Sequence, residues 1–105
     1  MAGDSRKAVD ERFYLSSVKG GGMLRREIWV DRHGRVVRYN LAYINHRIYV
    51  GDNGRVLGYD SAHGHHHRHH MGKVTAVRFG SFEAIETRFQ REWNRLAKEA
   101  GNAQD

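Results

Sequence analysis

The chain has 105 residues, a formal net charge of +6, and neither cysteine nor proline. The absence of cysteine excludes disulfides, thiolate metal sites and cysteine nucleophiles, and no apolar run approaches the roughly 18–20 residues that would span a bilayer. We therefore expect one basic, cytoplasmic domain over residues 1–105 with no membrane partner, and with flexible ends at 1–10 and 100–105.

The basic side chains are strongly biased in type. Fourteen arginines and four lysines make up the eighteen basic residues. Arginine binds phosphate through paired hydrogen bonds and stacks on bases and aromatic rings. The bias favours a polyanionic partner, RNA before DNA or an acidic protein, over a basic surface that is merely solvated.

The first half of the chain predicts three strands. Residues 12–18 form the first, with Phe13 and Leu15 on one face, and three glycines at 20–22 permit a turn after it. Residues 23–31 form the second, and residues 35–44 the third, after a turn at 31–34. One face of the second strand carries Leu24, Arg26, Ile28 and Val30, and the other carries Arg25, Glu27, Trp29 and Asp31. One face of the third carries Val37, Tyr39, Leu41 and Tyr43.

The middle of the chain predicts a second hairpin. Residues 45–47 interrupt the alternation, and residues 48–50 resume it briefly. Asp52-Asn53-Gly54 is typical of a tight hairpin turn, because Asn and Gly readily adopt positive φ. Residues 55–60 are then the return strand, and residues 73–79 a further short strand.

The last element is an amphipathic helix. Ser81 is a good N-cap, and five apolar residues follow at helical spacing: Phe82, Ile85, Phe89, Trp93 and Leu96. Gly101 predicts the end of the helix. An apolar stripe of this width needs a sheet face to cover. The sequence therefore predicts an α+β single domain, a twisted antiparallel meander of about five strands covered by one C-terminal helix.

Six of the eight histidines lie within residues 63–70, between two predicted strands. An affinity tag would stand at a terminus as an uninterrupted run, whereas this segment is internal and broken by Gly64 and Arg68. Two further interpretations give the segment no specific function: a solvated loop that is rich in histidine by chance, and a segment that binds metal non-specifically. We interpret the segment as the functional centre, a connector held at both ends.

The histidines predict acid–base chemistry. If residues 65–70 are extended, His65, His67 and His69 point one way, and His66, Arg68 and His70 the other. A pair of imidazoles can serve as base and acid near neutral pH, and an arginine can stabilise charge on a phosphate. Cleavage of RNA by its own 2′-hydroxyl needs these groups and no cofactor.

Metal binding is the rival interpretation. Imidazoles bind zinc, nickel and copper, and the candidate ligands here are His63, His65, His67 and His69. A zinc site usually adds a carboxylate or a cysteine, and the nearest carboxylates are Asp60 and Asp52. The sequence contains no HExxH or CxxC spacing.

A second constellation is the basic stretch at 25–38, which holds Arg25, Arg26, Arg32, Arg35 and Arg38. Trp29 lies within it, and four tyrosines follow at 39, 43, 49 and 59. Arginines and aromatics on an exposed sheet face hold single-stranded RNA, but the same aromatics suit a core, and both readings stay open. His33 and His46 fall in turns and are expected at the surface.

The segment Tyr59-Asp60-Ser61, followed by His66-His67-Arg68-His69 and Gly72, resembles the "YDN … HHRH … G" signature of the TumE family of bacterial toxins. The likeness extends to Ile28-Trp29-Val30, to residues 38–43 and to the closing helix. Ser61 in place of Asn, and the extra His65 and His70, depart from the signature. The resemblance implies a growth-inhibiting toxin of a type II toxin–antitoxin system, neutralised by a helix-turn-helix antitoxin.

The sequence-based hypothesis is a toxin that cleaves RNA without metal. His66, His67 and His69 are the acid–base candidates, Arg68 binds the scissile phosphate, and Tyr59 and Asp60 position an imidazole. The arginines expected to hold RNA are Arg25, Arg35, Arg38 and Arg55. The alternatives are a non-enzymatic RNA- or protein-binding module and a small metal-binding protein; homo-oligomerisation stays open.

Overall fold

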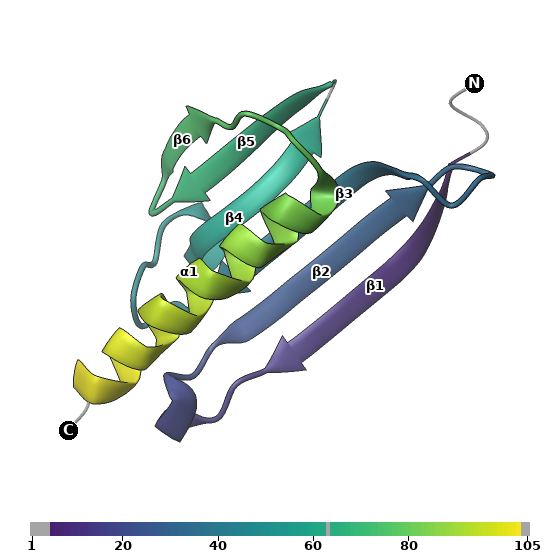
Figure 1. The fold of residues 1–105 in the computed structure, drawn as a ribbon. Helices are drawn as coiled ribbons and strands as arrows, with labels where there is room; N and C mark the ends of the chain where they lie inside the picture. The colour runs from purple at the N-terminus through teal and green to yellow at the C-terminus, as the bar shows by residue number, and fades with distance from the viewer. Residues whose placement is uncertain (1–4, 63, 104–105) are drawn as a thin grey trace.

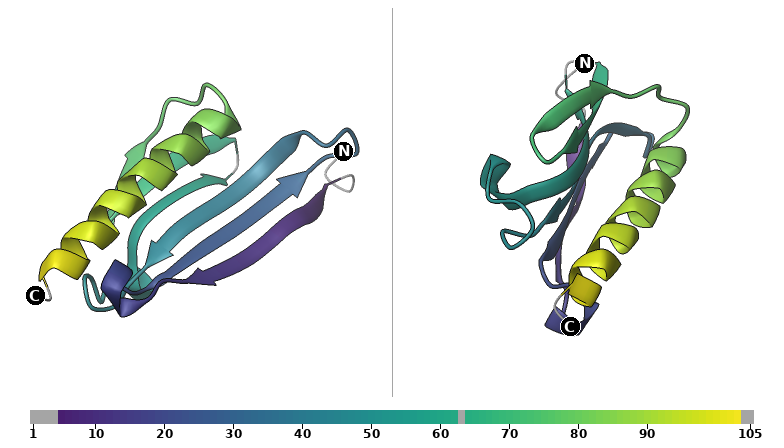
Figure 2. Two further views of the ribbon diagram at one scale, coloured as in Figure 1. Left: turned by 60° about the horizontal axis from the view of Figure 1, so that its bottom comes forward. Right: turned by 90° about the vertical axis from the view of Figure 1, so that its left-hand side faces the viewer.

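The strands pair in the order in which they occur along the chain, so that one antiparallel sheet carries a single long helix on one face (Figure 1). The computed structural model describes residues 5–62 and 64–103. Its elements are β1 (Arg6–Tyr14), η2 (Ser17–Lys19), β2 (Met23–Val30), β3 (Val36–Ile44), η3 (Asp52–Gly54), β4 (Arg55–Ala62), β5 (His65–His70), β6 (Lys73–Ala76) and α1 (Phe82–Ala103). Further views show α1 lying along one side of the sheet (Figure 2). The predicted α+β class is confirmed.

The sheet has six strands rather than about five because the histidine segment is itself a strand. β5 pairs with β4 from Leu57↔His70 to Ala62↔His65, and with β6 from His67↔Ala76 to His70↔Lys73. The interpretation of this segment as a connector was therefore wrong. Its backbone is satisfied by neighbours on both sides, which no local preference of histidine reveals. β6 is also shorter than the strand predicted at 73–79.

β1 begins earlier and ends earlier than the sequence predicted. Residues 6–10, expected to be frayed, pair with β2, whereas residues 17 and 18, expected to end the strand, belong to the short helix η2. Most of β1 is charged on both faces, so it shows no apolar alternation. Cross-strand ion pairs hold it instead, among them Lys7 to Glu27 at 2.5 Å and Arg26 to Glu11 at 2.8 Å.

Gly20 allows η2 to approach the helix. Its φ is +102°, and a Cβ at this position would lie 2.1 Å from the carbonyl oxygen of Ala97 in α1. Only glycine fits such a position. The predicted glycine turn thus also determines how closely the β1–β2 connection packs against the C-terminal half of the helix.

The loop between β3 and β4 departs from the predicted hairpin. Asp52 and Asn53 do adopt positive φ, as the turn signal indicated, but residues 48–50 form no strand. Asn45 organises this loop, because its buried amide donates to the carbonyl oxygen of Gly20 and to the Tyr43 hydroxyl, both at 3.0 Å. Its backbone carbonyl accepts the N–H groups of residues 48 and 49, which turns the chain away from the sheet.

The core lies between β3, β4 and α1. The predicted inward face of β3 is confirmed for Tyr39, Leu41 and Tyr43, which are buried, whereas Val37 is half exposed. All five predicted stripe residues of α1 belong to this core or pack against it. The Ser81 hydroxyl accepts the N–H of Ala84 at 3.1 Å, as expected of an N-cap, but α1 runs past Gly101 to Ala103.

One polar cluster fastens α1 to the sheet. The Tyr59 hydroxyl of β4 donates to the Glu92 carboxylate of α1, and Arg68 of β5 donates to the same carboxylate at 2.5 and 3.3 Å. Burial raises the pKa of Glu92, but the hydrogen bonds from Arg68 and Tyr59 outweigh it and bring the pKa below its ordinary 4.5. The cluster therefore holds an ionised carboxylate between helix and sheet.

Replacing the carboxylate should be costly. We expect Glu92→Ala to lower the free energy of unfolding by about 2–3 kcal/mol near neutral pH, because it leaves the half-buried Arg68 charge and the Tyr59 hydroxyl without a partner. The folded-state pKa of Glu92 is depressed, so its contribution is complete above about pH 4.5 and is lost as the pH falls through that lower pKa. Urea unfolding of variant and wild type across the acid range measures both effects.

Glu99→Ala is the matched control, because Glu99 is an exposed carboxylate on the same helix. Glu99→Ala should change the free energy of unfolding by no more than about 0.5 kcal/mol at every pH. Equal destabilisation by the two substitutions would show that the cluster does not stabilise the fold.

Candidate functional site

β5 presents its side chains to two different environments. His66, Arg68 and His70 face the side that α1 occupies, and His65, His67 and His69 face the open side of the sheet, as the extended backbone predicts. The cross-strand pairs match this division, since Tyr59 lies opposite Arg68 and Asp60 opposite His67. β5 thus presents three of its side chains to each face of the sheet.

This division separates residues that the sequence hypothesis had grouped. Arg68 and Tyr59 bind Glu92 on the helix side, so the structure does not bring them together with His67 and His69. His66 also lies on the helix side, where its Nδ1 is 2.9 Å from the Tyr39 hydroxyl. The structure therefore gives no support to a phosphate bound by Arg68 beside His67, because the alternation of a strand places adjacent residues on opposite faces.

Asp60 is the centre of the open-face cluster. Its Oδ1 lies 3.8 Å from His67 Nδ1, and its Oδ2 lies 2.9 Å from His69 Nε2 and 3.6 Å from Arg55 Nη1. Arg55 also approaches Asp52 at 2.8 Å and His69 Nδ1 at 3.1 Å. One carboxylate thus faces two imidazoles from the neighbouring strand β5 and a guanidinium from its own strand β4.

His69 is held by this network. A guanidinium has donors and no acceptor, so Nδ1 of His69 must accept the hydrogen bond from Arg55, and the proton of the neutral ring is on Nε2, toward Asp60. Nε2 is buried, and its angle to Asp60 leaves it without a hydrogen bond among the described residues. Arg55 thereby fixes the orientation of the His69 ring.

His67 and His65 are the accessible imidazoles of this face. The His67 ring is partly exposed, with the Asp60 carboxylate behind its Nδ1, which leaves Nε2 toward solvent. His65 is exposed, and its ring centroid lies 6.3 Å from that of His67. The alternation along residues 65–70 had placed His65 on the same face as His67, but the sequence analysis assigned His65 a role only as a possible metal ligand.

Gly58 makes room for the Arg55 side chain. A Cβ at residue 58 would lie 2.8 Å from Cδ of Arg55 and 3.3 Å from the carbonyl oxygen of Leu41. Gly58 pairs with His69 across β4 and β5. The absent side chain lets Arg55 cross the strand and reach both Asp60 and His69.

The predicted RNA-binding arginines fall in different settings. Arg38 lies over the Trp29 ring at 4.5 Å, and the described residues give it no carboxylate partner. Arg25 is paired with Asp10 at 2.5 Å and Glu27 at 3.3 Å. Arg35 is exposed at the β2–β3 turn, away from Asp60 along the strands. Of these, Arg38 is the guanidinium best placed to bind an anion.

A shallow hollow lies beside Asp60 on the open face. It has a volume of about 320 Å³, and its lining includes Arg38, Asn40, Arg55 and Asp60. Asn40 lies opposite Asp60 and donates to Glu27 at 3.0 Å, so its amide is fixed. Asn40 and Glu27 were missed by the sequence analysis, and only their place on the alternating face could have indicated them.

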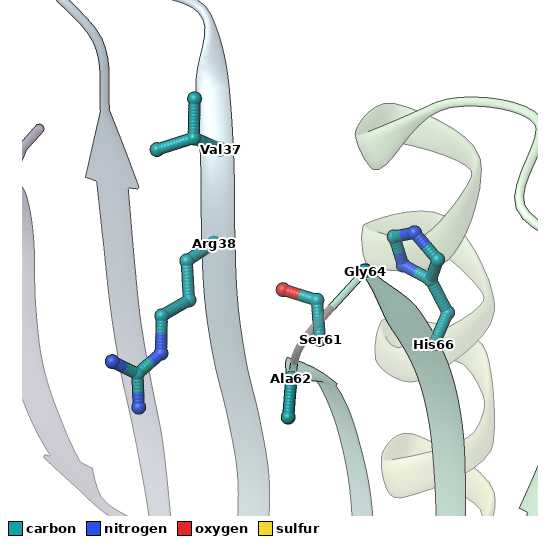
Figure 3. A pocket seen from close by; sticks show the side chains of 6 residues that line it. All are labelled: Val37, Arg38, Ser61, Ala62, Gly64 and His66. Carbon is teal, nitrogen blue, oxygen red and sulfur yellow. The ribbon is translucent and has the colours of Figure 1, made fainter. Parts of the chain in front are cut away.

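A second hollow, of about 290 Å³, opens where β3 and β4 separate (Figure 3). The strand pairing ends at Asn40↔Asp60, and beyond it the buried Ser61 hydroxyl accepts the Tyr39 N–H at 3.1 Å. In the figure the Ser61 side chain points toward β3, and Arg38 extends over β2. His66 lines this hollow from β5.

His66 is enclosed by aromatic rings. It stacks on Phe79 with centroids 4.1 Å apart and lies 5.7 Å from the Tyr39 ring. Burial, together with the neighbouring imidazoles of His67 and His65, lowers the pKa of His66, and burial raises the pKa of Tyr39 to about 12. The lowered pKa favours the neutral form of His66 at neutral pH, and Phe79 and Tyr39 hold its ring in place.

The geometry does not form a metal centre. Among residues 5–62 and 64–103, no three His, Asp or Glu side chains come together as ligands. The Arg55 guanidinium lies 3.1 Å from His69 Nδ1 and 3.6 Å from Asp60 Oδ2, so a positive charge already stands beside both of these groups. His63, one of the predicted ligands, lies outside the described residues. Within the same part of the chain, no helix has the length and apolarity needed to cross a membrane.

Comparison of the chain with protein-family models, with curated proteins and with solved structures finds no match. The resemblance to the TumE toxins therefore stays a prediction that rests on the residues quoted for it. What the chain does must be inferred from its own site.

The state of His69 is directly measurable. We expect long-range ¹H–¹⁵N spectra at neutral pH to show the tautomer with the proton on Nε2, because Arg55 donates to Nδ1. In Arg55→Ala this preference should weaken, whereas in Arg35→Ala, the loss of an exposed arginine in the β2–β3 turn, it should be unchanged. A proton on Nδ1 of His69 in the wild type would contradict the arrangement.

The titration of His66 tests its enclosure. We expect an NMR midpoint below its ordinary 6.5, because burial disfavours the charged ring. Phe79→Ala should raise the midpoint by exposing the ring. A depressed folded-state pKa also means that stability is lost as the pH falls from about 6.5 through the folded value. A wild-type midpoint at or above 6.5 would refute this assignment.

Proposed function

We propose that this protein acts on single-stranded RNA as a metal-independent ribonuclease, in the cytoplasm, as the toxin of a type II toxin–antitoxin pair. The observation that carries the enzymatic part is the grouping of Asp60, His67 and His65 on the uncovered sheet face, beside Arg38 and Arg55. The toxin role and a helix-turn-helix antitoxin partner rest on the resemblance to the TumE family.

The reaction needs a base, an acid and a cation. His67, backed by Asp60, accepts the proton of the 2′-hydroxyl, whose oxygen then attacks the adjacent phosphorus. His65, in its protonated form, gives a proton to the departing 5′-oxygen, so that a 2′,3′-cyclic phosphate and a free 5′-hydroxyl result. The spacing of 6.3 Å between the two rings suits groups that serve opposite ends of one phosphodiester.

The cations of this face differ in availability. Arg38 contacts an aromatic ring and has no carboxylate partner among the described residues, so it is free to bind a phosphate oxygen. Arg55 is already engaged by Asp52 and Asp60, and it orients the cluster. We assign phosphate binding to Arg38 and positioning to Arg55 and His69.

A binding module without catalysis is the second candidate. On the open face, Arg25 and Arg55 are paired with carboxylates, which reduces the positive charge beside the histidines. This favours RNA binding elsewhere on the surface, away from the histidines. Exposed basic residues on α1, among them Arg91, supply positive charge on the opposite side. Binding without cleavage would then use charge rather than the histidines.

The two candidates separate in one assay. The purified protein is incubated in EDTA with end-labelled single-stranded RNA, and the products are tested for 2′,3′-cyclic phosphate. We expect His67→Ala to reduce the cleavage rate by about 100-fold or more, because it removes the general base. Arg38→Ala should weaken RNA binding and lower its salt dependence. RNA with 2′-deoxy nucleotides should stay intact.

His33→Ala is the matched control for the histidine, since His33 is exposed in the β2–β3 turn. Arg78→Ala is the control for the arginine, since Arg78 is exposed between β6 and α1. Unchanged cleavage in His67→Ala would overturn the mechanism. Intact RNA with tight, salt-sensitive binding would establish the binding module instead, and activity that needs added metal would rule out metal-independent cleavage.

A further inference from the structure

A long apolar trough runs along the other side of the molecule, between α1 and the β1–η2 segment. Its main hollow has a volume of about 600 Å³, and its apolar lining includes Phe13, Leu15, Val18 and Trp93. Phe13 is 61% exposed and Val18 is 88% exposed. Single exposed apolar side chains are ordinary, but several around one concavity mark an interaction surface.

The trough extends along the helix past Trp93. A second hollow, of about 230 Å³, shares Trp93 and is lined by Leu24, Phe89 and the Arg26–Glu86 ion pair. From Glu86 to Lys98 the helix rises about 18 Å, the length of roughly twelve residues of a second helix. The two hollows therefore suit an elongated segment rather than a small molecule.

The charge of the rim indicates what kind of segment fits. Lys19, Arg95 and Lys98 line the main hollow, and its lining residues include no carboxylate. A second copy of this chain is a poor occupant, because each copy carries a formal net charge of +6. An acidic segment with apolar side chains complements both the floor and the rim.

We propose that the trough binds an acidic, amphipathic peptide segment of a partner protein. Its apolar side chains would cover Phe13, Val18 and Trp93, and its carboxylates would pair with the basic rim. The proposal is independent of the ribonuclease assignment, because the trough lies on the helix-bearing side and His67 on the opposite face.

The test selects peptides rather than assuming one. A phage library of random dodecapeptides is selected on the full chain, and the enriched peptides are synthesised. We expect enriched sequences to carry a net negative charge and at least two large apolar residues. Their affinity should fall about tenfold or more in Val18→Asp and in Lys98→Glu, which change the floor and the rim.

Arg91→Glu is the matched control, because it makes the same charge change on the same helix outside the trough. It should alter the affinity by less than about twofold. RNA cleavage and RNA binding should be unchanged in Val18→Asp, so the two proposals can fail separately. Thermal melting verifies that each variant is folded, and Phe13→Ser replaces Val18→Asp if that variant is not.

Three outcomes would overturn the proposal. They are the absence of enriched acidic peptides, equal binding to wild type and Val18→Asp, and an equal loss in Arg91→Glu, which would indicate attraction to surface charge alone. Concentration-dependent self-association that Val18→Asp abolishes would assign the trough to a second copy of the chain instead.

Discussion

The ionised carboxylate of Glu92, held between Tyr59 and Arg68, determines which side of the sheet α1 covers and which side stays exposed. It holds α1 against β4 and β5, and it forms an ion pair with Arg68, the one arginine of β5. A partly buried guanidinium that lost this partner would be costly, so the helix is fixed where the anchor lies. The side chains of Tyr39, Leu41, Tyr43, Leu57 and Tyr59, which lie in the core beneath α1, are buried. On the opposite face the side chains of Asp60 and His67 stay partly exposed.

The open face is organised by cross-strand pairs rather than by a pocket. Asp60, Asn40 and Glu27 lie at corresponding positions of β4, β3 and β2, and each contacts a partner on an adjacent strand. Such pairs hold side chains in place without burying them. The result is an ordered row in which Arg55 fixes His69 and the Asp60 carboxylate lies behind the partly exposed His67 ring.

The sequence predicted the elements that show a regular spacing of apolar residues within the element itself. The apolar stripe of α1 and its Ser81 cap, and the alternation of β2 and β3, were all readable from residue spacing. The N-terminal half of β1 was not predicted because ion pairs with β2, rather than apolar residues, hold it. β5 was not predicted because it is the neighbouring strands that satisfy its backbone hydrogen bonds. The site was half predicted: the alternation of histidines was evident, but which face the helix covers depends on Glu92, far along the chain.

The same anchor also specifies the register of β5. In a strand, a slip of one residue moves every side chain to the other face, and a segment that is almost all histidine carries little information to prevent it. Arg68 is its only different side chain between His65 and His70, and it reaches Glu92 only when it lies opposite Tyr59. A slip would place that charge on the open face and leave the carboxylate unpaired. By binding the helix, Arg68 therefore keeps His67 opposite Asp60.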